Sequence, residues 1–313
     1  MQYLESQGTV GEVRSISTGW ETEVYAFSLN DVPMVLRLYQ GSHVASRAEN
    51  EFRMLEHLGR VGYPVPRADR FEPDPSLFGG PFLLMERVEG SLLGRRFREH
   101  PRETIEQLCR LMVRLHGMDW KPFVGPGAVW PDLQTARGIF DTAMLTGLLK
   151  SADLLEPMQP VIDWIDEQGR AVTPKLSPVH SDFHFDNVLI RPDGSPAVID
   201  WGTTALADPR HDLGYTYVLL ATHGSLELAE QVRQTYEAMA GSQEDFDYFV
   251  NWALARRMLT MVVVLARGSA ALGLRPGLEG MLRRQLPYAQ MVTRLLQERT
   301  GVRLPGVEAL LVE

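Results

Sequence analysis

The sequence has one cysteine, no long apolar run and no strongly basic segment, and each absence argues against a class of protein. With Cys109 alone among 313 residues, no intrachain disulfide can form, which is typical of proteins from a reducing compartment. The most apolar stretch, 258–266, is bracketed by Arg256, Arg257 and Arg267. It falls well short of the ~18–20 apolar residues that span a bilayer. This stretch therefore predicts a core helix rather than a membrane anchor.

The charge balance argues against nucleic acid as a partner. The formal net charge is −9 and the pI is near 5.5, and no run is rich in Lys and Arg. A cationic or neutral small substrate fits this balance better. The first 13 residues lack both a basic start and an apolar signal core, so we expect a cytoplasmic protein that does not bind membranes. The sequence leaves open whether it is a monomer or a homodimer.

The first ninety residues show the pattern of several strands and one helix. Phe52, Leu55 and Leu58 recur at three-residue spacing and form one apolar stripe of a helix from about 44 to 60. Short runs of β-type composition surround this helix. These runs cover residues 13–17, 24–29, 34–39, 67–71 and 81–88.

After Gly90 the pattern becomes mainly helical, with apolar residues at helical spacing over 103–118 and a long loop of Pro and Gly over 120–135. There is no internal repeat. We therefore predict an α+β protein with two lobes: a small β-rich N-terminal lobe with one helix, and a large mainly helical C-terminal lobe. The boundaries would be 1–87 and 88–313, with a connector at about 86–91.

Two segments carry the chemistry. In the segment 180–190, Asp182 is followed five residues later by Asn187, just before an apolar strand-like run, and Asp200 ends a second apolar run. The residues between the runs, 191–196, have the composition of a turn. A hairpin there would bring Asn187 and Asp200 to neighbouring strand ends, with Asp182 close by. Two oxygen ligands and a free carboxylate suit a hard cation beside a hydroxyl, as in metal-dependent phosphoryl transfer.

From about residue 10 to about residue 215, the order of these features resembles the aminoglycoside phosphotransferase family, also called the choline-kinase-like family of small-molecule kinases. The family pattern is His-Gly-Asp, four residues and Asn, then Ile-Asp-Trp, then Asp-Pro and Asp-Leu. The matching residues here are His180-Ser181-Asp182 with Asn187, Ile199-Asp200-Trp201, Asp208-Pro209 and Asp212-Leu213. The resemblance implies a two-lobed protein-kinase-like fold, with residues 1–87 binding nucleotide and residues 88–313 providing catalysis and acceptor binding.

The resemblance also implies roles for the motif residues. Asp182 would be the catalytic base, which orients the acceptor hydroxyl and takes its proton. Asn187 and Asp200 would bind Mg²⁺ together with the nucleotide phosphates. His180 would support the loop through hydrogen bonds. For His184, an approach to substrate or phosphate and a packing role both remain open.

Two further positions concern the backbone of this loop. Ser181 stands where the family has glycine, which tolerates backbone torsions that serine avoids, so the local geometry is in question. Asp212 follows Asp208 in the order of the family, and we expect Asp212 to brace the catalytic loop rather than meet the substrate.

The phosphate-covering loop of the family corresponds to 18–23 in this chain. This loop has one glycine, Gly19, and Thr22 is its clearest side-chain donor, so backbone N–H groups would do most of the binding. A plain hairpin turn is the alternative reading of the same residues.

Arg37 falls at the position of the strand-borne lysine that pairs with nucleotide phosphates in the family. Arginine supplies a fixed fork of donors and can serve a phosphate, although the exchange is not neutral. The expected partner is Glu51, with Glu49 as the competing candidate and a surface ion pair as the alternative reading.

The connector between the lobes is implied to present backbone groups to the adenine edge. The residues concerned are Met85, Glu86 and Val88, with the Met85 side chain beside or behind the base.

The acceptor pocket should come from the C-terminal helices. Aromatic side chains there could hold a quaternary ammonium group by cation–π contact, although helix-core packing explains most of them equally well. Arg256 and Arg257 would instead suit an anionic group if either points inward. The candidate lining residues are Tyr215, Tyr217, Tyr248, Trp252, Arg256 and Tyr288.

The sequence therefore predicts a Mg²⁺-dependent kinase that uses ATP or GTP to phosphorylate a hydroxyl of a small molecule. The acceptor could be an aminoglycoside, a choline-like amino alcohol, homoserine or a sugar-like metabolite. The alternative is a nucleotide-binding pseudokinase or interaction module without turnover. A protein kinase is less attractive because no Ala-Pro-Glu-like motif follows Asp200.

Overall fold

The computed structural model of the chain describes residues 2–18, 22–40, 44–124, 149–150, 152–272 and 279–312. The chain divides into two compact units. Unit 1 comprises Met1–Arg98, Phe185–Thr204 and Gly273–Arg275, and unit 2 comprises Glu99–His184, Ala205–Leu272 and Pro276–Glu313. The hairpin at 188–200 therefore belongs to unit 1, whereas the boundaries predicted from sequence place these residues in the helical lobe. The predicted α+β fold, with a strand-rich first part and a helical second part, is confirmed.

Unit 1 is built on an antiparallel five-stranded sheet with the strand order β1-β2-β3-β5-β4. Asn30 and Asp31 join β2 to β3, and both have positive φ, at 50° and 63°. This is the requirement of a two-residue turn that matches the twist of its strands. The strands are β1 (Arg14–Thr18), β2 (Thr22–Leu29), β3 (Val32–Tyr39), β4 (Ala68–Glu72) and β5 (Phe82–Glu86).

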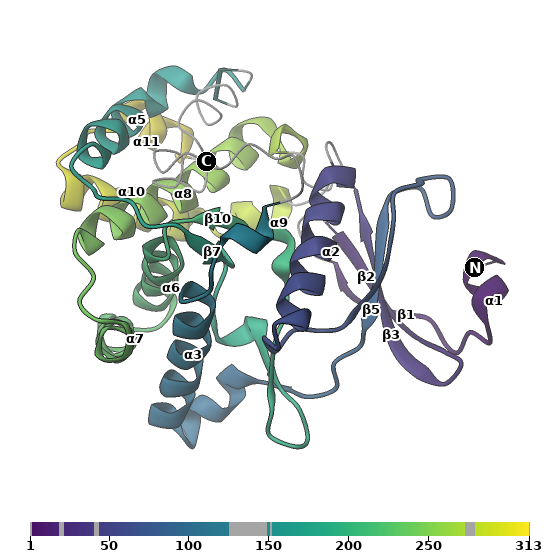
Figure 1. Cartoon of the computed structure of the whole chain (residues 1–313). Coiled ribbons are helices and arrows are strands. Elements are labelled where there is room, and N and C mark those ends of the chain that lie inside the picture. The colour runs from purple at the N-terminus through teal and green to yellow at the C-terminus, as the bar shows by residue number, and fades with distance from the viewer. Residues whose placement is uncertain are drawn as a thin grey trace. The chain divides into compact units, whose positions relative to one another are not determined.

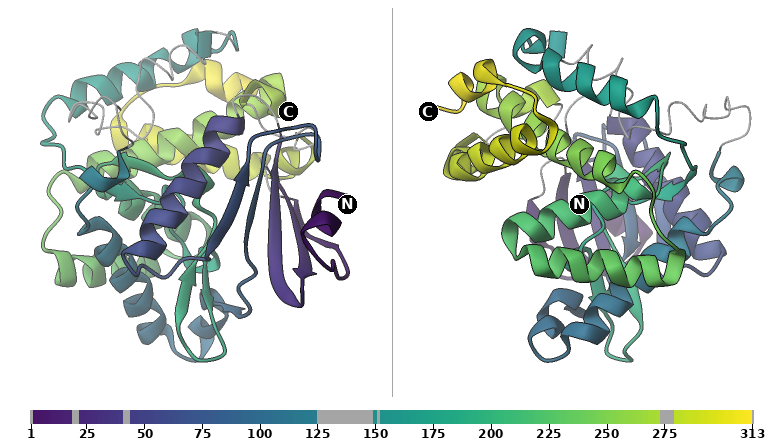
Figure 2. Two further views of the ribbon diagram at one scale, coloured as in Figure 1. Left: turned by 45° about the vertical axis from the view of Figure 1, so that its right-hand side comes forward. Right: turned by 90° about the vertical axis from the view of Figure 1, so that its left-hand side faces the viewer.

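The two faces of this sheet are covered by different helices, as Figures 1 and 2 show. On one face, Leu4 of α1 (Gln2–Gln7) packs with Leu36 and Leu38 of β3 in an apolar cluster. On the other face lies α2 (Val44–Arg60), the helix predicted from its apolar stripe. Because side chains alternate along a strand, β3 directs Arg37 and Tyr39 toward the α2 side. Both contact Glu51 of α2.

The predicted hairpin is present in unit 1. Its strands are β8 (Val188–Ile190) and β9 (Pro196–Val198), and β6 (Ser91–Leu92) pairs with the outer side of β8. The Arg191 N–H donates to the Ser195 carbonyl at 2.9 Å to close the turn, and Gly194 takes the positive φ (86°). Three short 3₁₀ turns flank the hairpin: η1 (Leu93–Arg98), η4 (Phe185–Asn187) and η5 (Trp201–Thr203).

Unit 2 is mainly helical. It also contains a two-stranded pair, β7 (Ser177–Val179) with β10 (Ala205–Ala207), and the 3₁₀ turns η2 (Lys121–Phe123) and η6 (Ser269–Leu272). Within the long loop expected over 120–135, residues 125–135 lie outside the described residues. The helices are α3 (Pro101–His116), α5 (Leu155–Gly169), α6 (Arg210–His223), α7 (Leu226–Ala240), α8 (Phe246–Arg267), α9 (Glu279–Arg284), α10 (Leu286–Thr300) and α11 (Pro305–Leu310).

The apolar stretch that the sequence predicts as a core helix lies in α8. By length and composition alone α8 could cross a membrane, but 72% of its most apolar window is buried inside the protein. α6, α10 and α11 all pack against α8, and Figure 2 shows α10 and α11 in yellow beside it. The burial is that of a central core helix.

Candidate active site

The register of the β8–β9 hairpin sets the positions of two predicted metal ligands. Val188 pairs with Val198, so Asn187 stands opposite Ile199, and the Ile199 N–H donates to the Asn187 carbonyl at 2.9 Å. Asp200 follows directly and has left-handed torsions, φ 67° and ψ 60°, which aspartate adopts more readily than most residues. The predicted placement of Asn187 and Asp200 at neighbouring strand ends is confirmed.

The strand end that carries Asp200 is anchored by the next residue. Trp201 is fully buried, and its indole N–H donates to the Val198 carbonyl at 2.9 Å. The Trp201 ring meets the edge of the Tyr63 ring, with centroids 5.9 Å apart. Asn187 is 7% exposed, whereas the Asp200 side chain is 48% exposed. The pair therefore combines a fixed backbone with a carboxylate that solvent can reach.

Arg37 binds two carboxylates at once. Its Nη1 lies 3.2 Å from Glu51 Oε1 and its Nη2 lies 2.6 Å from Asp200 Oδ1. Glu51 is only 2% exposed, and Glu49, the competing candidate, is exposed. Burial opposes the positive charge, but the two carboxylates outweigh it and raise the pKa of Arg37 well above its ordinary value. Arg37 therefore stays positively charged, and its two carboxylate partners fix the orientation of its guanidinium group.

Two residues beside this pair were missed in the sequence. The Tyr39 hydroxyl donates to Glu51 Oε2, and Tyr39 lies on the same face of β3 as Arg37, so strand alternation could have indicated it. Gly202 carries no local signal. A Cβ at Gly202 would lie 3.0 Å from Arg37 Nη2 and 3.3 Å from Glu51 Oε2. Because residue 202 is glycine, the Arg37–Glu51 ion pair can pack directly against η5.

The donor set at the hairpin fits Mg²⁺. This ion takes few protein ligands, commonly one or two carboxylates, and completes its octahedron with water and phosphate oxygens. Asn187 and Asp200 offer one amide oxygen and one carboxylate. Among the described residues, no three His, Cys, Asp or Glu side chains gather into a metal-binding cluster. The arrangement suits a metal that arrives with phosphates rather than one held by protein alone.

The connector after β5 is fixed through the Glu86 carboxylate. Arg191 Nη1 donates to Glu86 Oε1 at 2.5 Å, and the Arg67 N–H donates to Oε2 at 3.0 Å. The Glu86 N–H donates to the Arg67 carbonyl at 2.9 Å. The Met85 side chain is buried. Of the groups implied to face adenine, the Val88 N–H and the connector carbonyls therefore remain the better candidates.

Of the predicted phosphate loop, Gly19 lies outside the described residues. Thr22 begins β2, pairs with Tyr39 across the sheet and is 3% exposed. Its hydroxyl therefore belongs to a buried strand position, and its binding to phosphate stays a prediction.

Asp182 lies in unit 2, five residues before Asn187 in the chain. Its side chain is 31% exposed, and its Oδ2 lies 3.6 Å from His184 Nε2. Burial alone would raise its pKa, but hydrogen bonding with His184 and the charges of His184, His180 and Arg256 lower the pKa of Asp182 to about 2. Asp182 is therefore a carboxylate at neutral pH, as its predicted role requires.

Asp212 anchors the backbone that precedes Asp182. It is fully buried, and it accepts the His180 N–H at 2.8 Å and the Ser181 N–H at 2.6 Å. His116 Nε2 lies 3.0 Å from the same carboxylate. Burial alone would raise the pKa of Asp212, but the His116 hydrogen bond and charge lower it. These contacts are those expected of a residue that braces the loop.

Ser181 has the torsion that glycine would adopt freely. Its φ is 67°, in the left-handed region, and it is fully buried. The Ser181 carbonyl accepts from Arg256 Nη1 at 2.7 Å. Both the N–H and the carbonyl of Ser181 are therefore hydrogen-bonded to side chains. Its hydroxyl makes no hydrogen bond within the part of the chain described. The neighbouring His180 is also fully buried and packs its ring edge against Phe183, with centroids 5.4 Å apart.

Two of the candidate acceptor residues lie in the helical core. Tyr248 stacks on Trp164, with centroids 6.1 Å apart, and Trp252 packs its ring against the edge of His211 at 5.0 Å. Both are largely buried, at 7% and 3% exposed. Packing, the alternative left open by the sequence, accounts for these contacts. Tyr215 differs, because the Arg256 guanidinium lies 4.5 Å from its ring centroid.

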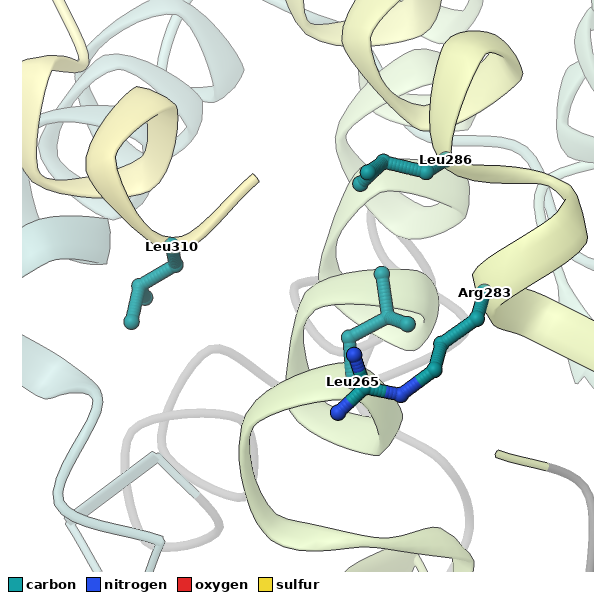
Figure 3. Close-up of a pocket in the computed structure, with 4 residues that line it drawn as sticks. All are labelled: Leu265, Arg283, Leu286 and Leu310. Carbon is teal, nitrogen blue, oxygen red and sulfur yellow. The ribbon is translucent and has the colours of Figure 1, made fainter. Parts of the chain in front are cut away.

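Two cavities in unit 2 are lined by residues other than the Asp182 loop. One, of about 330 Å³, lies among Leu265, Arg283, Leu286 and Leu310, which Figure 3 shows around the end of α8. The other, of about 720 Å³, includes Tyr248 among its lining residues. Residues 180–187 line neither cavity. The size of a cavity therefore does not indicate where the predicted catalytic residues lie.

Comparison with known proteins agrees with this fold and shows the family. Residues 12–248 match the phosphotransferase enzyme family. One similar solved structure is a thermostable mutant of aminoglycoside phosphotransferase APH(4)-Ia in ternary complex with AMP-PNP and hygromycin B. It is 16% identical in sequence, with a TM-score of 0.67. The match covers 95% of this chain and 97% of that chain. Aminoglycoside-3'-phosphotransferase of type VIII is 21% identical with a TM-score of 0.59, covering 80% and 93%.

Curated relatives are much longer than the matched region. Acyl-CoA dehydrogenase family member 10 of Mus musculus is 26% identical over 265 residues, which are 78% of this chain and 24% of the relative. Acyl-CoA dehydrogenase family member 11 of Homo sapiens is 24% identical over 188 residues, which are 55% of this chain and 23% of the relative. The chain spans about a quarter of the length of these relatives. Through residues 12–248, which include Asn187, Asp200 and the Asp182 loop, the chain belongs to the phosphotransferase enzyme family.

Proposed function

We propose that this protein transfers the γ-phosphoryl group of ATP or GTP to a hydroxyl group of a small molecule, with Mg²⁺. The observation that carries the proposal is the hairpin register, which brings Asn187 and Asp200 together in the segment that begins at Asp182. Family membership supports the reaction type. The solved relative bound to AMP-PNP and hygromycin B supports a nucleotide and a small acceptor as the two substrates.

Each residue then has a role that follows from its chemistry. Asp182, with a pKa of about 2, is a weak base, so it orients the acceptor hydroxyl and receives the proton late, when the bond to phosphorus is well formed. The guanidinium group of Arg37, held in a fixed orientation, donates hydrogen bonds to phosphate oxygens. Asn187 and Asp200 would hold Mg²⁺, which neutralises charge on the nucleotide phosphates when bound.

The names of the curated relatives do not alter the reaction type. This chain corresponds to about a quarter of each acyl-CoA dehydrogenase family member, and the phosphotransferase match accounts for residues 12–248. We therefore propose phosphoryl transfer, not dehydrogenation, for this chain. The names do justify the inclusion of hydroxylated acids and acyl thioesters among the acceptors to be tested.

One observation favours the alternative, a nucleotide-binding module without turnover. Arg37 lies 2.6 Å from Asp200 Oδ1, so the predicted metal ligand already has a cationic partner. If this ion pair persists when nucleotide binds, Asp200 would be a poorer ligand for Mg²⁺ and nucleotide could bind without reacting.

The test combines calorimetry with a turnover assay. ADP binding would be measured with and without Mg²⁺. Release of ADP from Mg·ATP, or of GDP from Mg·GTP, would be followed over a panel of aminoglycosides, amino alcohols, sugars, hydroxy acids and hydroxyacyl thioesters. Asp182→Asn is expected to lower kcat by about 10²–10⁴-fold while nucleotide binding is kept. Asp200→Asn is expected to remove the Mg²⁺-dependent part of ADP binding.

Asp193→Asn is the matched control, because Asp193 is an exposed residue of the same hairpin and the chemical change is identical. It should leave both measurements unchanged. Nucleotide binding without release of ADP with any acceptor would favour the alternative. If Mg²⁺ had no effect on ADP binding by the unchanged protein, the Mg²⁺-dependent kinase proposal would be wrong, and if ADP did not bind at all, both readings would be wrong.

A further inference from the structure

Arg257 of α8 is a half-buried cation for which the described residues provide no carboxylate partner. Its Nη1 donates to the Tyr215 hydroxyl at 3.2 Å, and its guanidinium lies 5.3 Å from the centroid of the Tyr288 ring. Its Nε is buried and makes no hydrogen bond, and no ion pair joins Arg257 to an acidic side chain within the described ranges. The side chain thus loses hydration without gaining an anion.

Two other arginines of the described residues, one buried and one half-buried, have carboxylate partners. Arg37 binds Glu51 and Asp200, and Arg210, which is 2% exposed, binds Asp208 at 2.7 Å. A buried charge without an opposite charge is costly, because desolvation is not offset by attraction to a partner. An incoming anion would remove this cost at Arg257.

The position of Arg257 connects it to the Asp182 loop. Two guanidinium groups lie near the ring of Tyr215. That of Arg256 is 4.5 Å from the ring centroid, and that of Arg257 is 5.9 Å from it. Arg256 in turn donates to the carbonyl of Ser181, the residue before Asp182. One aromatic ring therefore separates the unpaired cation from the arginine that holds the catalytic loop, and all of these residues belong to unit 2.

The groups around Arg257 are suited to oxyanions. Tyr288 contributes a hydroxyl that lies 3.1 Å from Thr222 Oγ1, and its ring packs against His223 with centroids 4.4 Å apart. Hydroxyl and guanidinium donors recognise carboxylate and phosphate oxygens, and Arg offers two parallel donors to either. A quaternary ammonium or protonated amine would meet repulsion here from Arg256 and Arg257.

We propose that Arg257, with the hydroxyls of Tyr215 and Tyr288, binds an anionic group of the acceptor, a carboxylate or a phosphate, while the acceptor hydroxyl lies at Asp182. This inference rests on the proposed function for the role of Asp182, but the anion site itself does not. The acceptor class is therefore a hydroxy acid or a phosphorylated alcohol, rather than an aminoglycoside or a choline-like amino alcohol.

The experiment separates binding from turnover. The full chain would be titrated by calorimetry, without nucleotide, with ω-hydroxy carboxylates of three to eight carbons, their amides, the matching amino alcohols, ω-hydroxyalkyl phosphates and inorganic phosphate. ADP release with Mg·ATP would be measured on the same compounds. Anionic members should bind, and the carboxylate and phosphate series show which oxyanion is preferred. Amides and amino alcohols should bind at least about tenfold more weakly.

Variants assign the site. Arg257→Gln should weaken binding of the anionic members by at least about tenfold, and Arg257→Lys should recover part of that loss because it keeps the charge. Tyr288→Phe, which keeps the ring, provides a second test if Arg257→Gln does not fold. Arg283→Gln is the charge-matched control, since Arg283 is exposed and lines the separate cavity of Figure 3.

The outcomes are distinct for the two proposals. Anion binding that depends on Arg257, without ADP release, would support the anion site and count against the kinase proposal. ADP release with amino alcohols but not with the anionic compounds would support the kinase proposal and overturn the anion site. Equal binding of anionic compounds by the unchanged protein and Arg257→Gln, or no binding of any anionic compound, would also overturn the anion site.

Discussion

At the scale of single residues, the protein uses arginine in two opposite settings. Arg37 is fixed by Glu51 and Asp200, so the cost of burying its charge is offset and its geometry is rigid. Among the described residues, the neighbours of Arg257 are aromatic rings and hydroxyl groups instead of a carboxylate. Carboxylate partners fix the orientation of a buried arginine, whereas a half-buried arginine that lacks them gains most from a ligand of opposite charge.

Ser181 is a second residue whose setting leads to a prediction. Ser181→Gly should increase the free energy of unfolding by about 1 kcal/mol, because it removes the cost of a left-handed torsion and a buried hydroxyl without a hydrogen bond. The greater freedom of glycine in the unfolded chain offsets part of this gain. Chemical denaturation monitored by circular dichroism would measure the difference.

Ser181→Ala is the control, because it removes the hydroxyl and keeps the left-handed torsion in a residue with a Cβ. Its stability should lie between those of the unchanged protein and Ser181→Gly. A Ser181→Gly variant less stable than the alanine variant would show that the torsion is not a source of strain.

At the scale of elements, the hairpin is joined to the connector by the pairing of β6 with β8, by an ion pair and by a close backbone approach. Arg191 of the hairpin turn binds Glu86 at 2.5 Å, and a Cβ at Gly90 would lie 2.4 Å from the Ile190 carbonyl. The same contacts position β9, at the end of which Asp200 lies. The connector and the hairpin should therefore move as one piece.

This coupling predicts the result of hydrogen exchange on Arg191→Met. Backbone amides of both the connector, 86–91, and the hairpin, 188–198, should exchange faster, by up to about fivefold, because the pair is partly exposed and contributes at most about 1 kcal/mol. Amides of α2 should be unaffected. Faster exchange confined to the hairpin would contradict the coupling.

The elements that could be predicted from sequence are those whose signal is local. The stripe of Phe52, Leu55 and Leu58 predicts α2, and turn residues between two apolar runs predict the β8–β9 hairpin, which places Asn187 beside Asp200. The Arg37–Glu51 pair followed from a family resemblance, because nothing local joins residues 14 positions apart on a strand and a helix. The close fit of Gly202 and the isolation of Arg257 depend on tertiary packing, so no spacing in the sequence could reveal them.

At the scale of the whole molecule, the acid limit of stability should depend on buried carboxylates. Asp212 connects α3, through His116, with the backbone of residues 180 and 181. Because its pKa is lowered in the folded state, the carboxylate contributes stability above its unfolded pKa of about 3.9, and this contribution is lost as the pH falls below that value. Asp182, with a folded pKa of about 2, adds a loss of the same sign.

Asp212→Asn should therefore change both the level and the slope of stability. At pH 7 the free energy of unfolding should fall by about 3–5 kcal/mol, the usual loss when one partner of a buried ionic network is removed. Between about pH 4 and pH 2 the variant should lose stability less steeply than the unchanged protein, because one proton-linked group is gone. Thermal unfolding at a series of pH values measures both effects, with exposed Asp166→Asn as the matched control. Parallel curves for the unchanged protein and Asp212→Asn would show that the Asp212 carboxylate is not what links the Asp182 loop to acid stability.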